Sequence, residues 1–501
     1  MKKITTFLFI AFLAATSQAQ NSTDGLRYST DQNTGTARFT ALSGAMGALG
    51  GDFSAMSINP AGGAVFLDSN LLFSTALFDI DNKANYFNST ENSFSDTASI
   101  NQLGAVFVLN NANKESKFKK LTLGLNFETT KNFNDEIFIA GNGHTSIGAF
   151  FLAQAQGIPL NQLQNSDYQF LGQTQGTAAQ NAFLGYQAYL FDPVDPNNPS
   201  NSSYVSNIAG NNFNQKYIYL SQGNNSKFTI NFATQITDNY FFGINLNTHT
   251  ISYDQSTYLL ENNNNPGSTV NSVGFENNLS VNGAGFSVQI GAIARVAEKL
   301  RLGLSLDTPT WYLISEETTQ NLESSRVFEN QIINEFIDPR VINVYEDYTL
   351  KTPAKVTASA AYIFGQKGLI SLDYSYKDYS SIDFSYTFDD SPYFNDLNRT
   401  IENSLKGASS FNAGAEYRLR QLSFRGGFHY EESPYQETEV VGDLSGFSLG
   451  AGYNFGNYTL DFAYSRSEQE RNQQLYSVGL TDAATINSIY SNFMVSVGFT
   501  F

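Results

Sequence analysis

Few side chains in this sequence have the types and spacing that catalysis requires. The chain has 501 residues, no cysteine and three histidines, so thiol nucleophiles, disulfides and zinc–thiolate sites are excluded. Serines are abundant, but no nucleophile motif surrounds any of them, as a Ser/His/acid hydrolase would need. We therefore expect no enzyme activity, no catalytic residue, no metal and no cofactor.

The histidines raise one further possibility, a haem-related receptor, which would need an axial histidine. His144 falls in a long connection, whereas His249 and His429 fall on the inward face of predicted strands. Because nothing else in the sequence points to haem, this reading stays an alternative.

Several charged residues share one face of the predicted strands. Charges inside a protein need partners, so most of them are expected to pair with one another and to anchor whatever fills the interior. Arg301 or Arg425 could instead bind a carboxylate head group, because a guanidinium binds a carboxylate in a bidentate way. The candidate interior and ligand residues are Arg301, Arg425, His429 and Glu416, and the same face carries Glu128, Asp307, Asp373 and Asp461.

Strands with strict alternation position these residues. Near the C-terminus, Phe493, Val495, Val497, Phe499 and Phe501 share one face, and the other face is small and mostly polar. Such segments approach the ~9–11 residues that a tilted strand needs to cross a bilayer. The pattern predicts about 14 strands, at roughly 69–80, 98–109, 118–129, 226–236, 240–252, 282–296, 299–307, 353–364, 368–386, 408–418, 421–430, 443–455, 457–466 and 491–501.

Short turns alternate with long loops between these strands. The long loops are predicted at roughly 81–97, 130–225, 253–281, 308–352, 387–407, 431–442 and 467–490. An even-stranded barrel with both ends in the periplasm predicts this rhythm, whereas a soluble β-sandwich does not. We therefore expect an all-β protein, a transmembrane antiparallel β-barrel.

The longest connection, 130–225, exceeds an ordinary loop. Its apolar residues have helical spacing, which predicts one or two short amphipathic helices outside the barrel. The helices could simply cap the barrel mouth or could form a first landing site for an apolar ligand. The residues concerned are Phe150, Phe151, Phe183 and Tyr186.

The N-terminus indicates export from the cytoplasm. Lys2 and Lys3 precede the apolar run 4–15, and Ser17-Gln18-Ala19 forms a cleavage site, so residues 1–19 are a predicted signal peptide. No later segment offers the ~20 consecutive apolar residues of a spanning helix. The net charge of -18 argues against nucleic acid as a partner.

Residues 41–66 are rich in glycine and alanine and lack a strand period. Small residues suit a segment packed in a confined space, so we expect a plug at 20–68 inside a barrel formed by 69–501. Gly50, Gly51 and Asp52, followed by Asn59, Pro60 and Ala61, resemble the N-terminal hatch of the FadL/TodX (OMPP1) family of outer-membrane transporters. Segments 422–434 and 448–464 also resemble that family, and the terminal Phe501 is similar to the ends of bacterial outer-membrane barrels.

The resemblance implies a monomeric, multi-pass barrel in the outer membrane of a Gram-negative bacterium, in contact with lipid and lipopolysaccharide. Hydrophobic small molecules, such as long-chain fatty acids or aromatic hydrocarbons, would reach an apolar pocket in the lumen. They would leave sideways through a gap in the wall, with the hatch as the gate. The alternative is a structural or secretion-accessory barrel that binds a protein partner.

Overall fold

The computed structural model describes residues 22–113, 115–386 and 392–501, and the predicted signal peptide lies outside these ranges. Its main element is one antiparallel sheet whose first and last strands pair, with Asn70 opposite Thr500, so that the sheet closes into a barrel. The strands of this sheet are β1 (Asn70–Tyr86), β2 (Ser89–Asn110), β3 (Phe118–Asn132), β4 (Asp135–Gly143), β7 (Phe213–Ile236), β8 (Tyr240–Asn262), β9 (Val270–Arg295), β10 (Leu300–Asp307), β11 (Trp311–Phe328), β12 (Gln331–Ile337), β13 (Asn343–Val344), β14 (Tyr348–Lys351), β15 (Lys355–Ile363), β16 (Gly368–Asp378), β17 (Asp383–Tyr386), β18 (Gly407–Leu419), β19 (Leu422–Glu431), β20 (Leu444–Asn454), β21 (Tyr458–Gln474) and β22 (Ala483–Thr500).

Several of these segments combine in pairs, and each pair forms a single strand of the wall. β3 and β4 both pair with β7, and β10 and β11 both pair with β9. In the same way, β14 continues β15, and β17 continues β16, while β12 and β13 lie further along the edge of β11. The described wall therefore has fourteen strands, and the predicted fold is confirmed.

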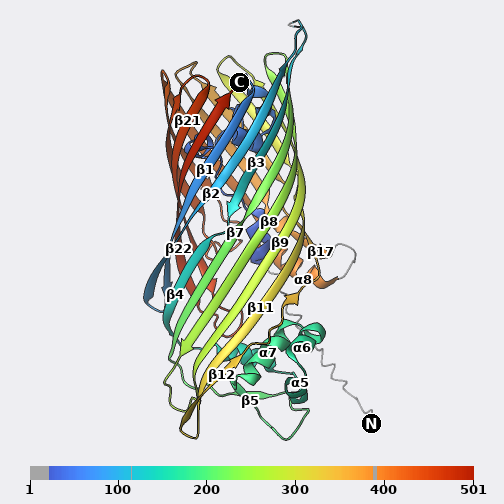
Figure 1. Cartoon of the computed structure of the whole chain (residues 1–501), viewed down its shortest axis with the longest axis vertical. Helices are drawn as coiled ribbons and strands as arrows, with labels where there is room; N and C mark the ends of the chain where they lie inside the picture. Colours follow the sequence, from blue (N-terminus) through green and yellow to red (C-terminus); the bar gives the residue numbers. More distant parts are fainter. Residues whose placement is uncertain (1–21, 114, 387–391) are drawn as a thin grey trace, which may run out of the picture.

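At one end of the barrel all connections between wall strands are short, and the C-terminus lies at this end, at the top of Figure 1. We call this the turn end and the opposite end the loop end. The turn end carries residues 111–117, 237–239, 296–299, 364–367, 420–421 and 455–457. The predicted alternation of short and long connections follows from this arrangement.

Several predicted long loops are wrong, because the strands continue beyond the point where their alternation ends. β1 and β2 are joined by Phe87 and Asn88, both with positive φ, in place of a loop over 81–97. The loop predicted at 253–281 shrinks to 263–269, the one at 467–490 shrinks to 475–482, and 308–352 contains β11 to β14. Outside the bilayer neither face of a strand must be apolar, so the backbone ladder persists while the sequence pattern is lost.

The connection between β4 and β7 holds four helices, where one or two were expected. They are α4 (Gly148–Ala155), α5 (Leu160–Asn165), α6 (Tyr168–Gln175) and α7 (Thr177–Gln187), followed by the small hairpin of β5 (Phe191–Pro193) and β6 (Tyr204–Ser206). We call residues 144–212 the head, which lies at the loop end in Figure 1. Its buried apolar residues form one hydrophobic core with residues of the extended strands β4, β7, β8 and β9.

The remaining helices are short. Within the N-terminal segment they are α1 (Ser22–Ser29), α2 (Ala37–Ala41), α3 (Phe53–Ile58) and the 3₁₀ helix η1 (Pro60–Val65). Between β16 and β18 the chain forms η2 (Tyr379–Ser381), η3 (Pro392–Phe394) and α8 (Asn395–Ser404). Among the described residues, no helix combines the length and the apolar character needed to cross a bilayer.

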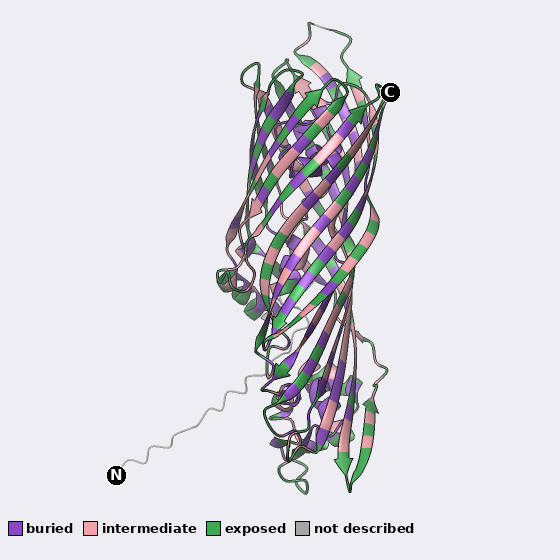
Figure 2. Ribbon diagram, turned by 90° about the vertical axis from the view of Figure 1, so that its left-hand side faces the viewer, coloured by how far each residue is buried: buried purple, intermediate pink, exposed green. Residues whose placement is uncertain are grey.

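The wall strands present apolar side chains outward at alternate positions. On β22, Phe493, Val495 and Val497 are 51%, 37% and 44% exposed, whereas Met494 and Ser496 are 1% and 2% exposed. Figure 2 shows the same alternation of exposed and buried residues along neighbouring strands. The outer surface is thus an apolar band suited to lipid, as the alternation of β22 predicted.

An arginine on the lipid face of β22 is expected to destabilise the barrel far more than one facing the lumen. Val495→Arg should lower the free energy of unfolding in lipid vesicles by about 2–4 kcal/mol, because the charge enters hydrocarbon. Asn492→Arg is the matched control, since Asn492 borders the lumenal cavity. Ser496 does not serve, because its hydroxyl accepts a hydrogen bond from Ala37 N–H. Urea unfolding followed by the fluorescence of the single tryptophan, Trp311, measures both variants, and equal destabilisation would contradict this assignment of faces.

Candidate functional site

The N-terminal segment, residues 22–66 (the hatch segment), lies inside the barrel and is hydrogen-bonded to the wall around most of its circumference. Its backbone and side chains bond to inward-facing residues of ten wall strands. These residues are Gln102, Glu128, Asn231, Asn245, Gln289, Arg301, Asp373, Glu416, Ser448 and Ser496. The lumen side chains therefore provide hydrogen-bond partners for many polar groups of a segment that has little regular structure of its own.

The first half of the hatch motif builds a turn and starts a helix. Gly50 and Gly51 have φ of +61° and +66°, the left-handed conformation that glycine adopts without strain. Asp52 then caps α3, because its carboxylate accepts the Ser54 N–H at 2.9 Å and the Thr36 hydroxyl. The same carboxylate thus joins α3 to the start of α2.

The second half of the motif ends α3 and starts η1. The Asn59 side chain accepts the Ala61 N–H at 3.1 Å and donates to the carbonyls of Gly47 and Ala292, at 3.0 and 3.1 Å. Pro60 begins η1, where its missing N–H costs nothing. The motif therefore shapes the hatch backbone and holds it against β9.

Glycine occupies the wall at three positions where the hatch backbone comes close. A Cβ added to Gly303 would lie 2.6 Å from the Gly47 carbonyl oxygen, and one on Gly243 would lie 2.3 Å from the Pro60 carbonyl carbon. A Cβ on Gly427 would lie 2.6 Å from the Leu42 carbonyl carbon. Any side chain at these positions would push the hatch inward, so the wall is shaped to the hatch.

Three of the predicted ligand residues contact the hatch or its anchors. Glu416 accepts from Arg38 Nε of the hatch at 2.9 Å and from Arg425 Nε at 2.7 Å, and Arg425 also pairs with Asp461. Arg301 donates to the Leu49 carbonyl at 2.9 Å. None of Arg301, Arg425 and Glu416 lines the main cavity.

The three histidines lie in separate regions. His429 borders the cavity, and its Nδ1 has no hydrogen-bond partner in the described chain. His249 lies 2.9 Å from the Ser287 hydroxyl, and His144 is exposed on the head. The described residues contain no cluster of three or more histidine or acidic side chains arranged to hold a metal.

A cavity of about 1100 Å³ lies between residues 23–34 of the hatch segment and the loop-end halves of the strands. Its lining differs from the apolar pocket expected from the sequence. Apolar residues such as Leu26, Phe133 and Ile137 share it with a group of cations, namely Arg27, Lys131, Lys227, Lys355, Lys377 and Arg471. The cavity is therefore amphipathic.

Most of these cations have acidic partners. Lys227 pairs with Glu128 at 2.7 Å, Arg471 with Asp135 at 3.5 Å, and Lys377 with Asp31 at 3.0 Å. Burial raises the pKa of the Asp31 carboxyl, but Lys377 and Lys355 outweigh it and hold that pKa well below its usual range. Asp31 is consequently ionised at neutral pH and balances these lysines.

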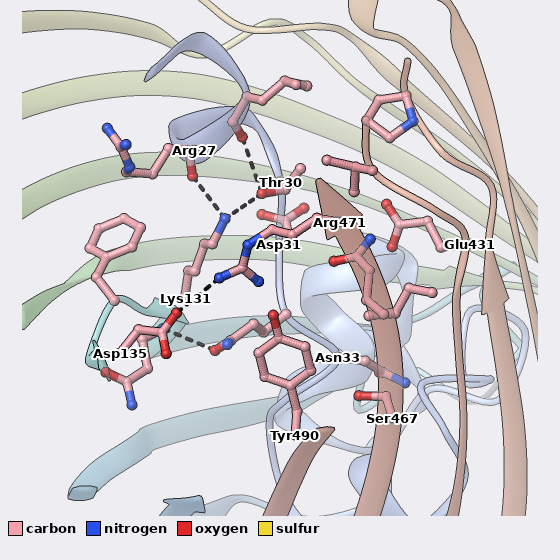
Figure 3. Close-up of a pocket in the computed structure, with 18 of the residues that line it drawn as sticks. Arg27, Thr30, Asp31, Asn33, Lys131, Asp135, Glu431, Ser467, Arg471 and Tyr490 are labelled. Atoms are coloured by element: carbon pink, nitrogen blue, oxygen red, sulfur yellow. Dashed lines mark hydrogen bonds and ion pairs between the residues drawn. The ribbon is translucent and has the colours of Figure 1, made fainter. Parts of the chain in front are cut away.

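Lys131 differs from the other cations. Its ammonium donates to the Arg27 carbonyl at 3.0 Å and to the Thr30 hydroxyl, so its hydrogen-bond partners within the described chain are uncharged (Figure 3). In Figure 3, Arg471 instead points toward Asp135. Lys131 is the cavity cation best placed to bind an anionic group.

The wall is interrupted beside Lys131. β2 pairs with β3 only from Gln102 opposite Glu128 to Asn110 opposite Lys120. Beyond that point, residues 89–100 of β2 pair with β1, and β3 and β4 pair with β7, with no bridge between the two sides in the described chain (Figure 1). Side-chain bonds span the break, such as Ser93 Oγ to the Glu136 carbonyl at 2.8 Å.

The hatch segment braces this break from inside. Gln32 N–H donates to the Thr130 carbonyl at 2.9 Å, and the Gln32 side chain accepts the Asn132 N–H at the same distance. The ring of Tyr28 packs edge-on against Phe133, which follows the end of β3, with ring centroids 6.0 Å apart. A shift of residues 27–34 would therefore disturb the break directly.

The sequence singled out neither the wall residues at the break nor the cations of the cavity. Lys131 and Arg471 follow the predicted ends at 129 and 466. Lys377 was accessible to the parity argument, since it follows Asp373 and Ser375 on the same face. The predicted loop residues lie in the head, where Phe151 is fully buried against Phe275 and Phe183 and Tyr186 are half-buried.

Comparison with known proteins agrees with this architecture. The structure is similar to that of a Pseudomonas aeruginosa FadL homologue, at 13% identity over 94% of this chain and 99% of that chain, with a TM-score of 0.53. It is also similar to the Pseudomonas putida toluene transporter TodX, at 12% identity over 94% of this chain and all of that chain, with a TM-score of 0.51. These likenesses establish the fold. No curated protein matches the sequence.

The sequence itself matches a family over residues 199–496, more than half of the chain. The family is described as outer membrane protein transport proteins (OMPP1/FadL/TodX), which are transport channels and not enzymes. A hatch-filled barrel of fourteen strands that contains the residues of this match is thus an outer-membrane transport protein, and the chain belongs to the OMPP1/FadL/TodX family.

Proposed function

We propose that this outer-membrane channel for hydrophobic compounds takes up an amphiphile with an anionic head, such as a long-chain fatty acid, in preference to a neutral aromatic hydrocarbon. The observation that carries the proposal is Lys131, a cation with uncharged hydrogen-bond partners in an amphipathic cavity. A carboxylate would pair with its ammonium, while the alkyl chain lies along Leu26, Phe133 and Ile137.

The break between β2 and β3 supplies an exit into the membrane. The cavity lining includes residues 128–135, which run along the break. Release into periplasmic water would cost about 0.8 kcal/mol for each CH₂ group exposed. Lateral release avoids that cost, because the chain passes from the cavity into hydrocarbon.

The hatch is proposed as the gate, with residues 20–68 acting as the plug of a monomeric barrel formed by 69–501. A carboxylate bound to Lys131 would compete with the hatch for the same ammonium, which now bonds to Arg27 and Thr30. Loss of those bonds would release residues 27–34 from β3 and widen the break. Glu416, Arg301 and Arg425 would hold the remainder of the hatch to the wall until this first release lets it shift as well.

The aromatic residues of the head are proposed mainly to hold the head over the barrel mouth. Phe150 packs against Tyr476 at 4.9 Å and Phe151 against Phe275 at 5.0 Å between ring centroids. Phe183 and Tyr186 retain partly exposed rings that an arriving apolar chain could contact first. The alternative of a barrel that only holds a protein partner is less well supported, since the lumen contains a large cavity.

Locking the hatch to the wall should stop uptake reversibly. The hydroxyls of Ser43 in the hatch and Ser448 in β20 lie 2.7 Å apart, so Ser43→Cys/Ser448→Cys should form a disulfide in a chain that has no other cysteine. Oxidation should abolish uptake of a labelled long-chain fatty acid by cells that lack other transporters, and a reductant should restore it.

The matched control is Thr357→Cys/Ser375→Cys. These hydroxyls lie 2.9 Å apart on the paired strands β15 and β16, so that disulfide leaves the hatch free. Uptake should be the same in its oxidised and reduced forms. Full uptake by the oxidised Ser43/Ser448 pair would show that transport does not need movement of this part of the hatch.

Removing the Lys131 ammonium should weaken recognition of the acid alone. Hydrogen bonds to charged groups contribute about 1.5–3 kcal/mol, so Lys131→Met should weaken binding of a long-chain fatty acid roughly tenfold or more relative to its methyl ester. Lys131→Arg retains the charge and should preserve the acid-over-ester preference. Equilibrium binding to detergent-purified protein measures these ratios, and an unchanged ratio in Lys131→Met would rule out Lys131 as the head-group site.

A further inference from the structure

The turn end of the barrel carries an arc of exposed cations across three adjacent turns. Ile363 N–H donates to the Lys299 carbonyl and Arg418 N–H to the Lys367 carbonyl, both at 2.8 Å, which places the turns side by side. Lys299, Lys367, Arg418 and Arg420 are all exposed there, with Glu298 as the exposed acid of the same turns. The whole chain has 46 acidic and 28 basic residues, so this arc runs against the overall charge.

An apolar groove on the outside of the wall adjoins the middle of this arc. The groove has a volume of about 500 Å³, and its lining includes Lys367 at one end. Its walls are outward-facing side chains of β16, β18 and β19 and of the turn before β16, each 47–58% exposed: Phe364, Ile370, Tyr417 and Phe424. The groove therefore opens on the lipid-facing band. Glu416 and Arg425 also border it, from the alternate positions of β18 and β19 whose side chains pair on the inner face.

We propose that this groove and arc form a specific site for one anionic phospholipid of the periplasmic leaflet. An acyl chain lies in the groove, and the phosphate and its neighbouring anionic head meet Lys367 and Arg420. Long loops of an even-stranded barrel face outward, so the turn end lies at the periplasmic leaflet. Cations near a membrane surface attract anionic lipids, and aromatic residues sit favourably at the headgroup level.

The two parts of the site together favour a lipid over other anions. A free phosphate would leave the groove empty, and an acidic soluble protein would not reach side chains that face hydrocarbon. Arg418 is partly engaged, because its guanidinium lies 2.6 Å from Glu416, which leaves Lys367 and Arg420 as the main head-group contacts. The site is independent of the uptake route, because the site lies at the turn end, whereas the cavity lies in the loop-end half of the barrel.

Native mass spectrometry of the detergent-purified full chain tests the proposal with two probes, phosphatidylglycerol and phosphatidylcholine of matched acyl chains. The unmodified protein should retain one phosphatidylglycerol in preference to phosphatidylcholine. Lys367→Gln/Arg420→Gln should reduce that preference roughly tenfold or more, because each cation near an anionic lipid surface contributes about a factor of five. Fatty-acid uptake should be unchanged in this variant.

Two further variants make the result specific. Lys117→Gln removes an exposed cation from a different turn and should leave the preference intact. Phe424→Ala shortens one wall of the groove and should lower retention of both lipids without changing their ratio. Equal retention of the two lipids by the unmodified protein, an unchanged ratio in the double variant, or an equal loss in Lys117→Gln would each overturn the site.

Discussion

The structure depends on mutual satisfaction of polar groups between the hatch segment and the barrel lumen. A closed barrel buries a ring of inward-facing amides, hydroxyls and charges, and a short plug with little regular structure buries unpaired backbone groups. Each provides the partners that the other lacks: Asp373 accepts the Gly47 N–H at 2.8 Å, and Asn245 donates to the Met56 carbonyl at 2.9 Å. Without the hatch these wall groups would need water, and without the wall the hatch would not hold its shape.

The same constraint explains which lumen charges are available for a ligand. Arg301 and Glu416 bond to Leu49 and Arg38 of the hatch, and Arg425 bonds to Glu416, so the hatch and its anchors occupy all three. Toward the loop end the hatch narrows to residues 22–34, and a cavity remains beside it. Charges that face this cavity can meet a guest molecule, and Lys131 does so at the point where the wall is broken.

The break itself reflects competition for hydrogen bonds. Residues 129–132 of β3 can pair with β7 on one side, while on the other side they face the hatch, which offers Gln32 and Thr34 in place of a β2 ladder. β2 accommodates the loss by a register shift opposite Ser74 and Thr75, where Asn101 turns inward to donate to the Gly35 carbonyl. Hatch and break are therefore parts of one arrangement.

Much of the fold could be predicted because the lipid-facing and lumen-facing positions of a membrane barrel alternate between apolar and polar residues along each strand. Alternation such as that of Phe493 to Phe501 reports directly which side meets lipid, and fourteen strands follow from it. Where strands leave the bilayer, as in β1 beyond Ile80 or β8 beyond Ser252, either face tolerates polar residues, so alternation alone underestimates the length of these strands. The sequence predicts fewer helices in the head than the structure has, because α5 and α6 are short and bury only two residues each.

The site was only partly accessible for a different reason. The sequence by itself determined the hatch motif, since Asp52 and Asn59 act through their own neighbours as helix caps and glycine pairs make local turns. It also determined which charges face inward. Only the tertiary structure decided which charges face the cavity beyond the predicted strand ends and which of them find partners, because Lys131, Asp31 and Arg471 come from segments far apart in the chain. Local periodicity specifies the direction of a side chain, whereas its partner depends on how the barrel closes around the hatch.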